Sequence, residues 1–416
     1  MSEQKFSNIV AGIAFLATLA VVVISLASMI FPLLIISQTY EFFPDELNPL
    51  ETSPWLVPII FSNLILFGFG FAYKKNKLPK SLQNGVRFVL NFEISKKVAV
   101  IIGGVIILIY IGLSVEELTY FEGDQFPDWF LMQKALEIWP STDSLDLHVT
   151  EQNTRYVRML LLDFSQQYLE NIKILPFVAS ILVVIFTALI TIQITKKKFA
   201  GIIAILVLLQ SFTFLEFDTI AVYENFWVLF YLISLYTIQR RWPLSSISFI
   251  LAVFTKAFVV TYFFMNIYWI FRAEISKRKK FILLGTYGGV VGVTLAVFQY
   301  TRSIYDEVVR LDSSEYFEGF TGWGNSMQFD PLMVLCILPL TVALYIKSRR
   351  GFVYADAILV LILGSILAGP FIATITDIYY ILPYRFIPFV VFMAIGIGML
   401  FSKEINLKYD KPTNNS

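Results

Sequence analysis

Long apolar runs, separated by short charged or turn-rich breaks, recur along the whole sequence. A helix of about 20 apolar residues is long enough to cross the roughly 30 Å hydrocarbon core of a bilayer. Lipid offers no hydrogen-bond partner to the backbone, so such runs must fold as helices. We therefore expect an all-α polytopic transmembrane bundle. Its spans are expected near 9–36, 55–73, 98–114, 174–194, 199–215, 220–238, 281–299, 331–347, 353–375 and 382–401.

The composition agrees with this class and excludes others. Hydrophobic residues make up 57% of the chain and charged residues 15%, which is outside the range of soluble globular proteins. The first run lacks the basic region and cleavage site of a signal peptide, so we expect it to be retained. The single cysteine, Cys336, excludes an intrachain disulfide, and the lone histidine, His148, cannot build a zinc site. The net charge of +1 argues against a nucleic-acid partner.

The apolar segment 244–271 is too long for a single span. As one helix it would be about 42 Å long, far more than one crossing requires. Basic residues flank both of its ends, Arg240 and Arg241 before it and a cluster from Arg272 to Lys280 after it. Since basic loops stay in the cytoplasm, both flanks should lie on that side. We expect a hairpin of two short helices that turns near Thr255 and Lys256, and about twelve spans in total.

This hairpin gives a consistent assignment of sides. The acidic loops 38–54, 115–172 and 300–330 then all face outward, and both termini are cytoplasmic. The cell membrane is the expected location. The remaining basic clusters face the cytoplasm, and they lie at 74–80, 96–97, 196–198, 347–350 and 403–411.

The largest outer loop, 115–172, contains two amphipathic stretches, DWFLMQKALEIW and TRYVRMLLLDFSQQYLENI. Their aromatic and leucine faces are typical of helices that lie in the plane of the membrane interface. Half-buried loop helices that cover the bundle are the alternative. The sequence shows no repeat and no appended soluble domain.

Acidic residues near the outer face are candidates for chemistry. Glu122 and Asp124 follow the span 98–114 closely, and Asp128 comes next in the same loop. Carboxylates so placed can take a proton from a hydroxyl or hold a divalent cation, although solvated surface acids are also common. Glu224 lies near the start of a later span, where either the helix dipole or a binding site would favour it.

Two basic residues are expected near the same face. Lys256 lies deep in LAVFTKAFVV, where an unpaired ammonium is costly, so it should pair with an acid, extend to the interface or bind a phosphate. Arg385, between Pro383 and Pro388, can anchor the last span at the interface or clamp phosphate or carboxylate oxygens.

The order of these features resembles a known superfamily. An outer-loop acid motif and an acid that opens a later span are followed by YLISLYTIQRRWPLSSISFILAVFTKAFVV and PYRFIPFVVFMAIGIGML. This order is similar to that of the GT-C polytopic glycosyltransferases, of the protein O-mannosyltransferase and aminoarabinose transferase type. The likeness covers residues 98–401. It leaves 1–97 as two additional spans with a cytoplasmic loop and 402–416 as a cytoplasmic tail.

The resemblance implies an inverting transfer of a sugar from a polyprenyl-phosphate donor to a hydroxyl of a glycan, lipid or protein, on the non-cytoplasmic face. Asp124, with Glu122 beside it, would match the catalytic acid. Glu224, Lys256, Arg385 and Asp128 would bind substrate. The chain departs from the family in having Glu-Gly-Asp-Gln where Asp-Glu or Asp-x-Asp is common.

Metal dependence and two rival functions remain open at this stage. No cofactor is required, but a divalent cation, Mg²⁺ or Mn²⁺, would have Asp124 and Glu224 as its candidate ligands. A secondary transporter also has about twelve spans and intramembrane charges, although we find no pair of related halves. A noncatalytic membrane subunit with the same fold is the third reading.

Overall fold

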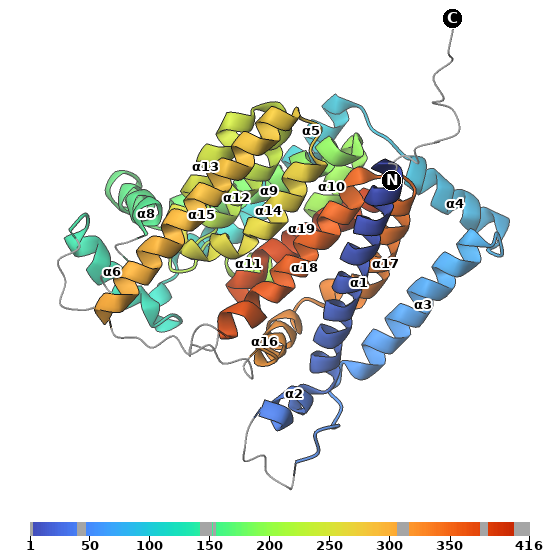
Figure 1. Cartoon of the computed structure of the whole chain (residues 1–416), viewed down its shortest axis with the longest axis horizontal. Coiled ribbons are helices and arrows are strands. Elements are labelled where there is room, and N and C mark those ends of the chain that lie inside the picture. The colour runs from blue at the N-terminus through green and yellow to red at the C-terminus, as the bar shows by residue number, and fades with distance from the viewer. Residues whose placement is uncertain are drawn as a thin grey trace, which may run out of the picture.

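The computed structural model describes residues 3–39, 47–141, 152, 155–305, 316–374 and 382–402. Within these ranges the chain is helical and contains no strand, which confirms the all-α prediction (Figure 1). His148, residues 403–416 of the expected cytoplasmic tail, and parts of the expected outer loops 38–54, 115–172 and 300–330 lie outside the described residues.

Among the described residues, eight helical segments are long and apolar enough to cross a membrane, which makes the chain an integral, multi-pass membrane protein. They include α1 (Glu3–Ile30), α3 (Leu56–Lys74), α5 (Lys96–Ser114), α9 (Ile174–Thr195), α15 (Lys277–Tyr305), α17 (Pro331–Arg349) and α18 (Val353–Ala373). The eighth joins the short helix η4 (Pro383–Phe386) to α19 (Ile387–Leu400).

Four further apolar segments are shorter than these eight. They are α10 (Lys198–Leu208), α12 (Phe226–Arg240), α13 (Trp242–Thr255) and η3 (Ala257–Tyr262) followed by α14 (Phe263–Arg272). The expected span 199–215 is divided because the Ser211 side chain caps a separate short helix, α11 (Phe212–Glu216). The expected span 220–238 begins late, since residues up to Asn225 form a loop.

The remaining elements connect these helices at their ends. They are α2 (Pro32–Thr39), α4 (Lys80–Asn91), η1 (Val115–Thr119), η2 (Glu122–Asp124), α6 (Asp128–Ile138), α8 (Tyr156–Leu169) and α16 (Glu318–Met327).

Helix α19 forms the centre of the core. Nearly all of its residues are buried, and it packs against α9, α10, α17 and α18. Gly398 allows this close approach, because a Cβ there would lie 2.7 Å from the Thr191 side chain and 2.8 Å from the Ala200 carbonyl oxygen. Small residues at helix crossings bring backbones together in the same way in many membrane proteins.

The first helix belongs to the same core as the last ones. The hydroxyl of Thr18 in α1 donates to the Leu359 carbonyl of α18 over 3.2 Å, and Ser28 donates to the Phe320 carbonyl of α16 over 3.1 Å. The ring of Phe15 stacks on Tyr345 of α17 with 4.1 Å between centroids. Figure 1 shows α1 running beside these C-terminal helices.

Contacts between distant segments define two opposite ends of the bundle. At the first, which we call the Tyr354 end, Gln239 of α12 donates to the Tyr354 hydroxyl and Arg272 of α14 pairs with Asp356. The segment from α13 to α14 therefore begins and finishes at one end. It turns at Lys256, whose extended backbone (φ −154°, ψ 112°) stops α13, as the sequence predicted.

At the opposite end, which we call the Tyr384 end, this turn meets the start of η4. The loops on either side of η2 and the loop before α12 lie at the same end.

Candidate functional site

Two basic residues that are far apart in the sequence meet on one aromatic ring. The Lys256 ammonium lies 3.9 Å from the centroid of the Tyr384 ring and 5.6 Å from that of Trp227. The Arg385 guanidinium carbon lies 5.7 Å from the same Tyr384 ring, and its Nε donates to the Tyr384 hydroxyl over 3.3 Å. Aromatic faces stabilise cations that have left bulk water. We call Lys256, Arg385 and Tyr384 the cationic cluster.

The fold places the cluster by two interruptions of helices. The extended backbone of Lys256 separates α13 from η3, so its side chain leaves the helical path. Pro383 opens η4, where its fixed φ suits a first helical turn, and the next two residues complete the cluster. Arg155, directly before α8, also lies within electrostatic range of Lys256. The sequence patterns gave no reason to single out Arg155.

An aromatic pair connects the cationic cluster to the acidic outer loop. Tyr223 stacks on Tyr384 with 4.4 Å between ring centroids and 11° between ring planes. The Tyr223 hydroxyl donates to Oδ2 of Asp128 over 3.0 Å. Asp128 is thus connected to Lys256 through the stacked rings of Tyr223 and Tyr384.

Glu224 belongs to the same region but is engaged in a buried ion pair. Nε of Arg158 donates to Oε2 of Glu224 over 2.9 Å, and each side chain is only 3% exposed. Nη2 of Arg158 also donates to the Val222 carbonyl over 2.9 Å. A buried charge needs such a partner, so each residue of the pair fixes the other.

Sequence reasoning missed Arg158, although a signal was present. Arg158 shares a helical face with Leu162 and Ser165, at spacings of four and seven residues, and all three side chains are buried in α8. A charged residue on a buried face requires a buried partner, and Glu224 was the intramembrane acid that lacked one.

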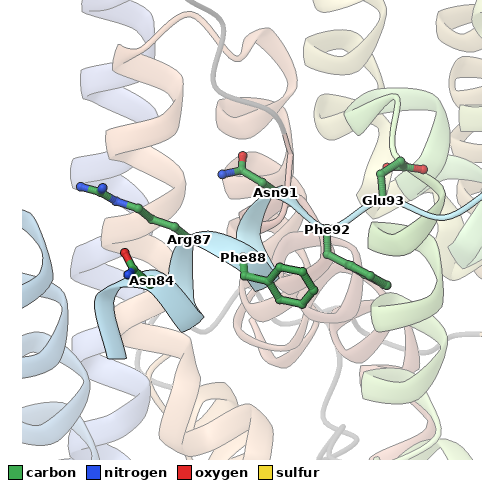
Figure 2. Close-up of a pocket in the computed structure, with 6 residues that line it drawn as sticks. All are labelled: Asn84, Arg87, Phe88, Asn91, Phe92 and Glu93. Atoms are coloured by element: carbon green, nitrogen blue, oxygen red, sulfur yellow. The ribbon is translucent and has the colours of Figure 1, made fainter. Parts of the chain in front are cut away.

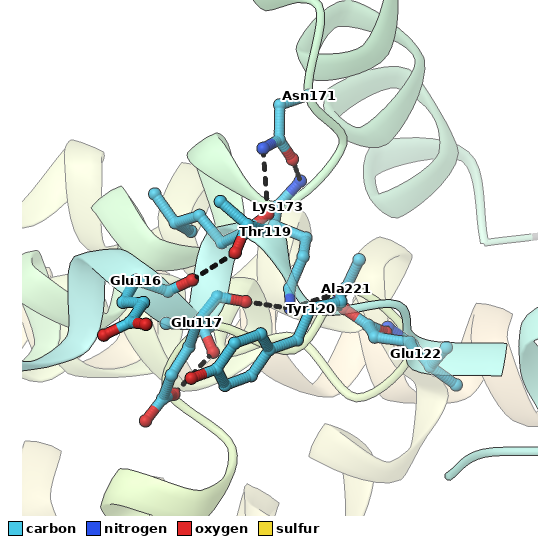
Figure 3. Close-up of polar contacts among 11 residues, drawn as sticks. Glu116, Glu117, Thr119, Tyr120, Glu122, Asn171, Lys173 and Ala221 are labelled. Atoms are coloured by element: carbon cyan, nitrogen blue, oxygen red, sulfur yellow. Dashed lines mark hydrogen bonds and ion pairs between the residues drawn. The ribbon is translucent and has the colours of Figure 1, made fainter. Parts of the chain in front are cut away.

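Glu122 is buried rather than directed into an open site. Figure 3 shows its side chain beside Ala221. Its two carboxylate oxygens accept from the backbone N–H groups of Ala221 and Val222 over 2.7 and 3.1 Å. Burial raises the pKa of Glu122, while these two bonds and the Lys173 ammonium at 3.8 Å oppose the rise. The sequence placed Glu122 beside the catalytic acid, whereas its contacts indicate that it holds the loop before α12 against η2.

Lys173 completes this attachment of the loops, as Figure 3 shows. Its ammonium donates to the carbonyl oxygens of Glu117 and Tyr120 over 2.5 and 3.2 Å. Asn171 donates to the Leu118 carbonyl over 3.0 Å. The loop after α5 is therefore tied to the loop before α9, and the acidic segment 115–128 is held at the Tyr384 end.

Asp124 differs from its neighbour Glu122. It is exposed at the end of η2, and it forms no hydrogen bond or ion pair with any described residue. Gly123 keeps the turn compact, because a Cβ there would lie 2.5 Å from the Phe121 ring. Asp124 is thus the solvent-facing carboxylate of the pair that the sequence singled out.

The arrangement of the acids does not suit a metal ion. Within the described ranges, no three His, Cys, Asp or Glu side chains form a group that could hold one. Of the two expected ligands, Glu224 is occupied by Arg158 and Asp124 lies on the surface.

The two amphipathic stretches of the outer loop form α6 and α8. One face of α8 packs against α9 and α13, and the other exposes Tyr156, Leu160, Phe164 and Tyr168. Helix α8 therefore covers the bundle on one face and presents an apolar face outward on the other.

No family model, curated protein or solved structure matches this chain.

Proposed function

We propose that this protein is a membrane glycosyltransferase of the GT-C type, which moves a sugar from a polyprenyl-phosphate donor to a hydroxyl acceptor with inversion. One observation carries the proposal. Lys256 and Arg385 converge on Tyr384, and Tyr223 connects Tyr384 to Asp128 in the acidic loop. Cations beside acids at one end of a membrane bundle suit a reaction that deprotonates a hydroxyl and releases a phosphate.

The cationic cluster has the chemistry of a phosphate site. The planar guanidinium of Arg385 can bind two phosphate oxygens at once, and Lys256 adds a compact charge. Tyr384, which is 4% exposed, separates this region from bulk water and so strengthens electrostatic contacts there. The pair Arg158 and Glu224 keeps the surrounding loop in place.

The proposed topology has twelve crossings, formed by the eight long segments and the four shorter ones. In support, the Tyr354 end gathers the basic loops around Arg241, Arg272 and Arg350, which the positive-inside rule assigns to the cytoplasm. Both termini are then cytoplasmic in the cell membrane, and the Tyr384 end faces outward.

In the proposed mechanism, the acceptor hydroxyl oxygen attacks the anomeric carbon of the donor while its proton passes to the carboxylate of Asp124. The new glycosidic bond forms as the bond between that carbon and the phosphate oxygen breaks. The electron pair leaves with the polyprenyl phosphate, whose charge Lys256 and Arg385 stabilise. Asp128 orients Tyr223 and, through it, Tyr384.

The test is sugar transfer or hydrolysis by the full chain in lipid nanodiscs, followed by mass spectrometry with a panel of polyprenyl-phosphate sugars. Loss of a general base lowers rates by about 10²- to 10⁴-fold, which we expect for Asp124→Asn. Lys256→Gln should cause a loss of about 10²-fold by weakening stabilisation of the leaving phosphate. Lys134→Gln, an exposed change on α6, should leave the rate unchanged.

The proposal fails if the parent protein turns over none of the donors, or if folded Asp124→Asn and Lys256→Gln variants both keep the parent rate. Asp128→Asn distinguishes the two acids of the loop. If this variant loses activity while Asp124→Asn does not, the role of base passes to Asp128.

A further inference from the structure

Helix α4 joins two membrane-spanning helices, α3 and α5, at the Tyr354 end, where it lies to one side of the bundle in Figure 1. Its last turn is fixed there, because the Lys197 ammonium donates to the Leu90 carbonyl over 2.7 Å. Glu93, just beyond α4, accepts from the backbone N–H of Lys198 over 3.0 Å. No residue of α4 is buried. The helix is thus held at the level where the spans end but is left uncovered.

The two faces of α4 differ in polarity. Leu82, Val86 and Val89 recur at the spacing of one helical face, whereas Asn84, Arg87 and Asn91 occupy the opposite face. The exposed fraction is 45% for Leu82 and 44% for Val89, so the described residues do not cover the apolar face of α4. A short helix of this pattern beside two spans suits the interface between hydrocarbon and headgroups.

The charge around α4 is strongly positive. Glu93 is the single acid between residues 74 and 97, and its Oε1 pairs with the Lys198 ammonium at 3.4 Å. Basic segments next to a span attract the anionic lipids of the cytoplasmic leaflet. The basic residues of this stretch are Lys74, Lys75, Lys77, Lys80, Arg87, Lys96 and Lys97.

A hollow of about 570 Å³ opens along α4, and Figure 2 shows the residues that line it. The guanidinium of Arg87 and the rings of Phe88 and Phe92 point in opposite directions. The two rings lie 5.5 Å apart. Arg87 forms no hydrogen bond or ion pair with the described residues, and the amides of Asn84 and Asn91 lie on its face. The hollow therefore combines free donors with an aromatic rim.

We propose that α4 is an interfacial helix that binds an anionic phospholipid through this hollow. The headgroup phosphate is bound by Arg87, with Asn84 and Asn91 as further donors, because a guanidinium pairs well with phosphate oxygens. The rings of Phe88 and Phe92 contact the glycerol and the first acyl carbons. Leu82 and Val89 face the hydrocarbon. This surface lies at the end opposite the cationic cluster, so the inference does not depend on the proposed activity.

The first test is native mass spectrometry of the full chain, released from nanodiscs of phosphatidylcholine with and without phosphatidylglycerol. We expect retained phosphatidylglycerol on the parent protein and about fivefold less on Arg87→Ala, the change expected for one basic residue at a membrane surface. Lys134→Ala removes the same charge on α6 at the opposite end and should retain as much as the parent. Equal retention by Arg87→Ala and the parent would overturn the site.

The second test locates α4 in the bilayer. Single cysteines at Val89 and Asn84, in a Cys336→Ser background, carry a spin label in the reconstituted full chain. We expect the label at Val89 to be more accessible than the label at Asn84 to oxygen, which concentrates in lipid. The label at Asn84 should be the more accessible of the two to a water-soluble nickel complex. Equal access of the water-soluble complex to both positions would mean that α4 projects into water, and the proposal would be wrong.

Discussion

Acidic residues of similar sequence context have different environments in this protein. Glu122 is buried against backbone amides and Asp124 is exposed, although only Gly123 separates them. Asp218 is buried as well, and its Oδ2 accepts from the Ser114 hydroxyl over 2.9 Å. Burial removes water from a carboxylate and disfavours its charged form. At the scale of the residue, burial and hydrogen bonding therefore distinguish acids that hold the fold, such as Glu122 and Asp218, from an acid that can react, such as Asp124.

Asp218 makes the stability of the protein depend on pH. Burial raises its pKa to about 7, against the hydrogen bond from the Ser114 hydroxyl, which lowers it. The pKa of an aspartate in an unfolded chain is about 3.9, so the folded state binds the carboxyl proton of Asp218 more tightly than the unfolded state does. Stability should fall as the pH rises from about 4 to about 7, and the penalty should be complete above that range.

Asp218→Asn removes this penalty, because its amide does not ionise. In detergent, we expect the Tm of the variant minus that of the parent to increase between pH 4 and pH 7 and then to level off. Glu137→Gln, an exposed change on α6, is the control and should follow the parent at every pH. A Tm difference for Asp218→Asn that stays constant over the whole range would exclude a role for this carboxyl.

At the scale of the element, helices were predictable and their lengths less so. Apolar runs located every long helix, and the basic flanks of 244–271 located the turn at Lys256. The lengths of α10 and α12 depend on Ser211 and on the loop that Glu122 holds. The Ser211 cap is local, since its side chain accepts from the Phe214 N–H three residues on. The Glu122 contact joins segments about a hundred residues apart, so no local pattern reveals it.

The candidate site was likewise only partly predictable from the sequence. Charged residues in apolar surroundings stood out in the sequence, which is why Lys256, Arg385 and Glu224 could be named. Their partners could not, because Tyr384 and Tyr223 resemble the many other aromatic residues of the chain. Asp128 could be named but not connected, since its link to Lys256 passes through two rings.

The turn at Lys256 predicts which residues share a side of the membrane. Single cysteines at Arg241 and Lys277, in the Cys336→Ser background, should react with a membrane-impermeant maleimide from the same side of sealed vesicles. A cysteine at Lys134 on α6 should react from the opposite side. All three positions are exposed. Labelling of Arg241→Cys and Lys277→Cys from opposite sides would show that 242–272 crosses the membrane once.

At the scale of the whole molecule, the first and last parts of the chain form one core. Helix α1 packs on α16, α17 and α18, and its Val22, Leu26 and Met29 are buried. Helix α3, in contrast, packs on α17 and has one buried residue, Ile59. The two N-terminal spans, which the sequence set apart as additional, therefore contribute unequally.

This packing predicts that a divided chain reassembles. If the gene is split between Lys77 and Leu78 and both pieces are expressed together, the tagged N-terminal piece should copurify with the remainder. The remainder expressed alone should have a Tm lower by several degrees, because burial of α1 is lost. If the remainder alone unfolds at the temperature of the parent, α1 is dispensable for the core.

The contacts of α1 also bear on how the protein is made. Synthesis produces α1 before α17 and α18, so α1 enters the lipid before these partners are available. Two hydroxyls of α1 form hydrogen bonds that need no other helix. Thr18 donates to the Ala14 carbonyl over 2.7 Å and Ser25 to the Val21 carbonyl over 2.8 Å, both within the helix. These internal bonds satisfy polar groups that hydrocarbon cannot, so α1 can be inserted without its later partners.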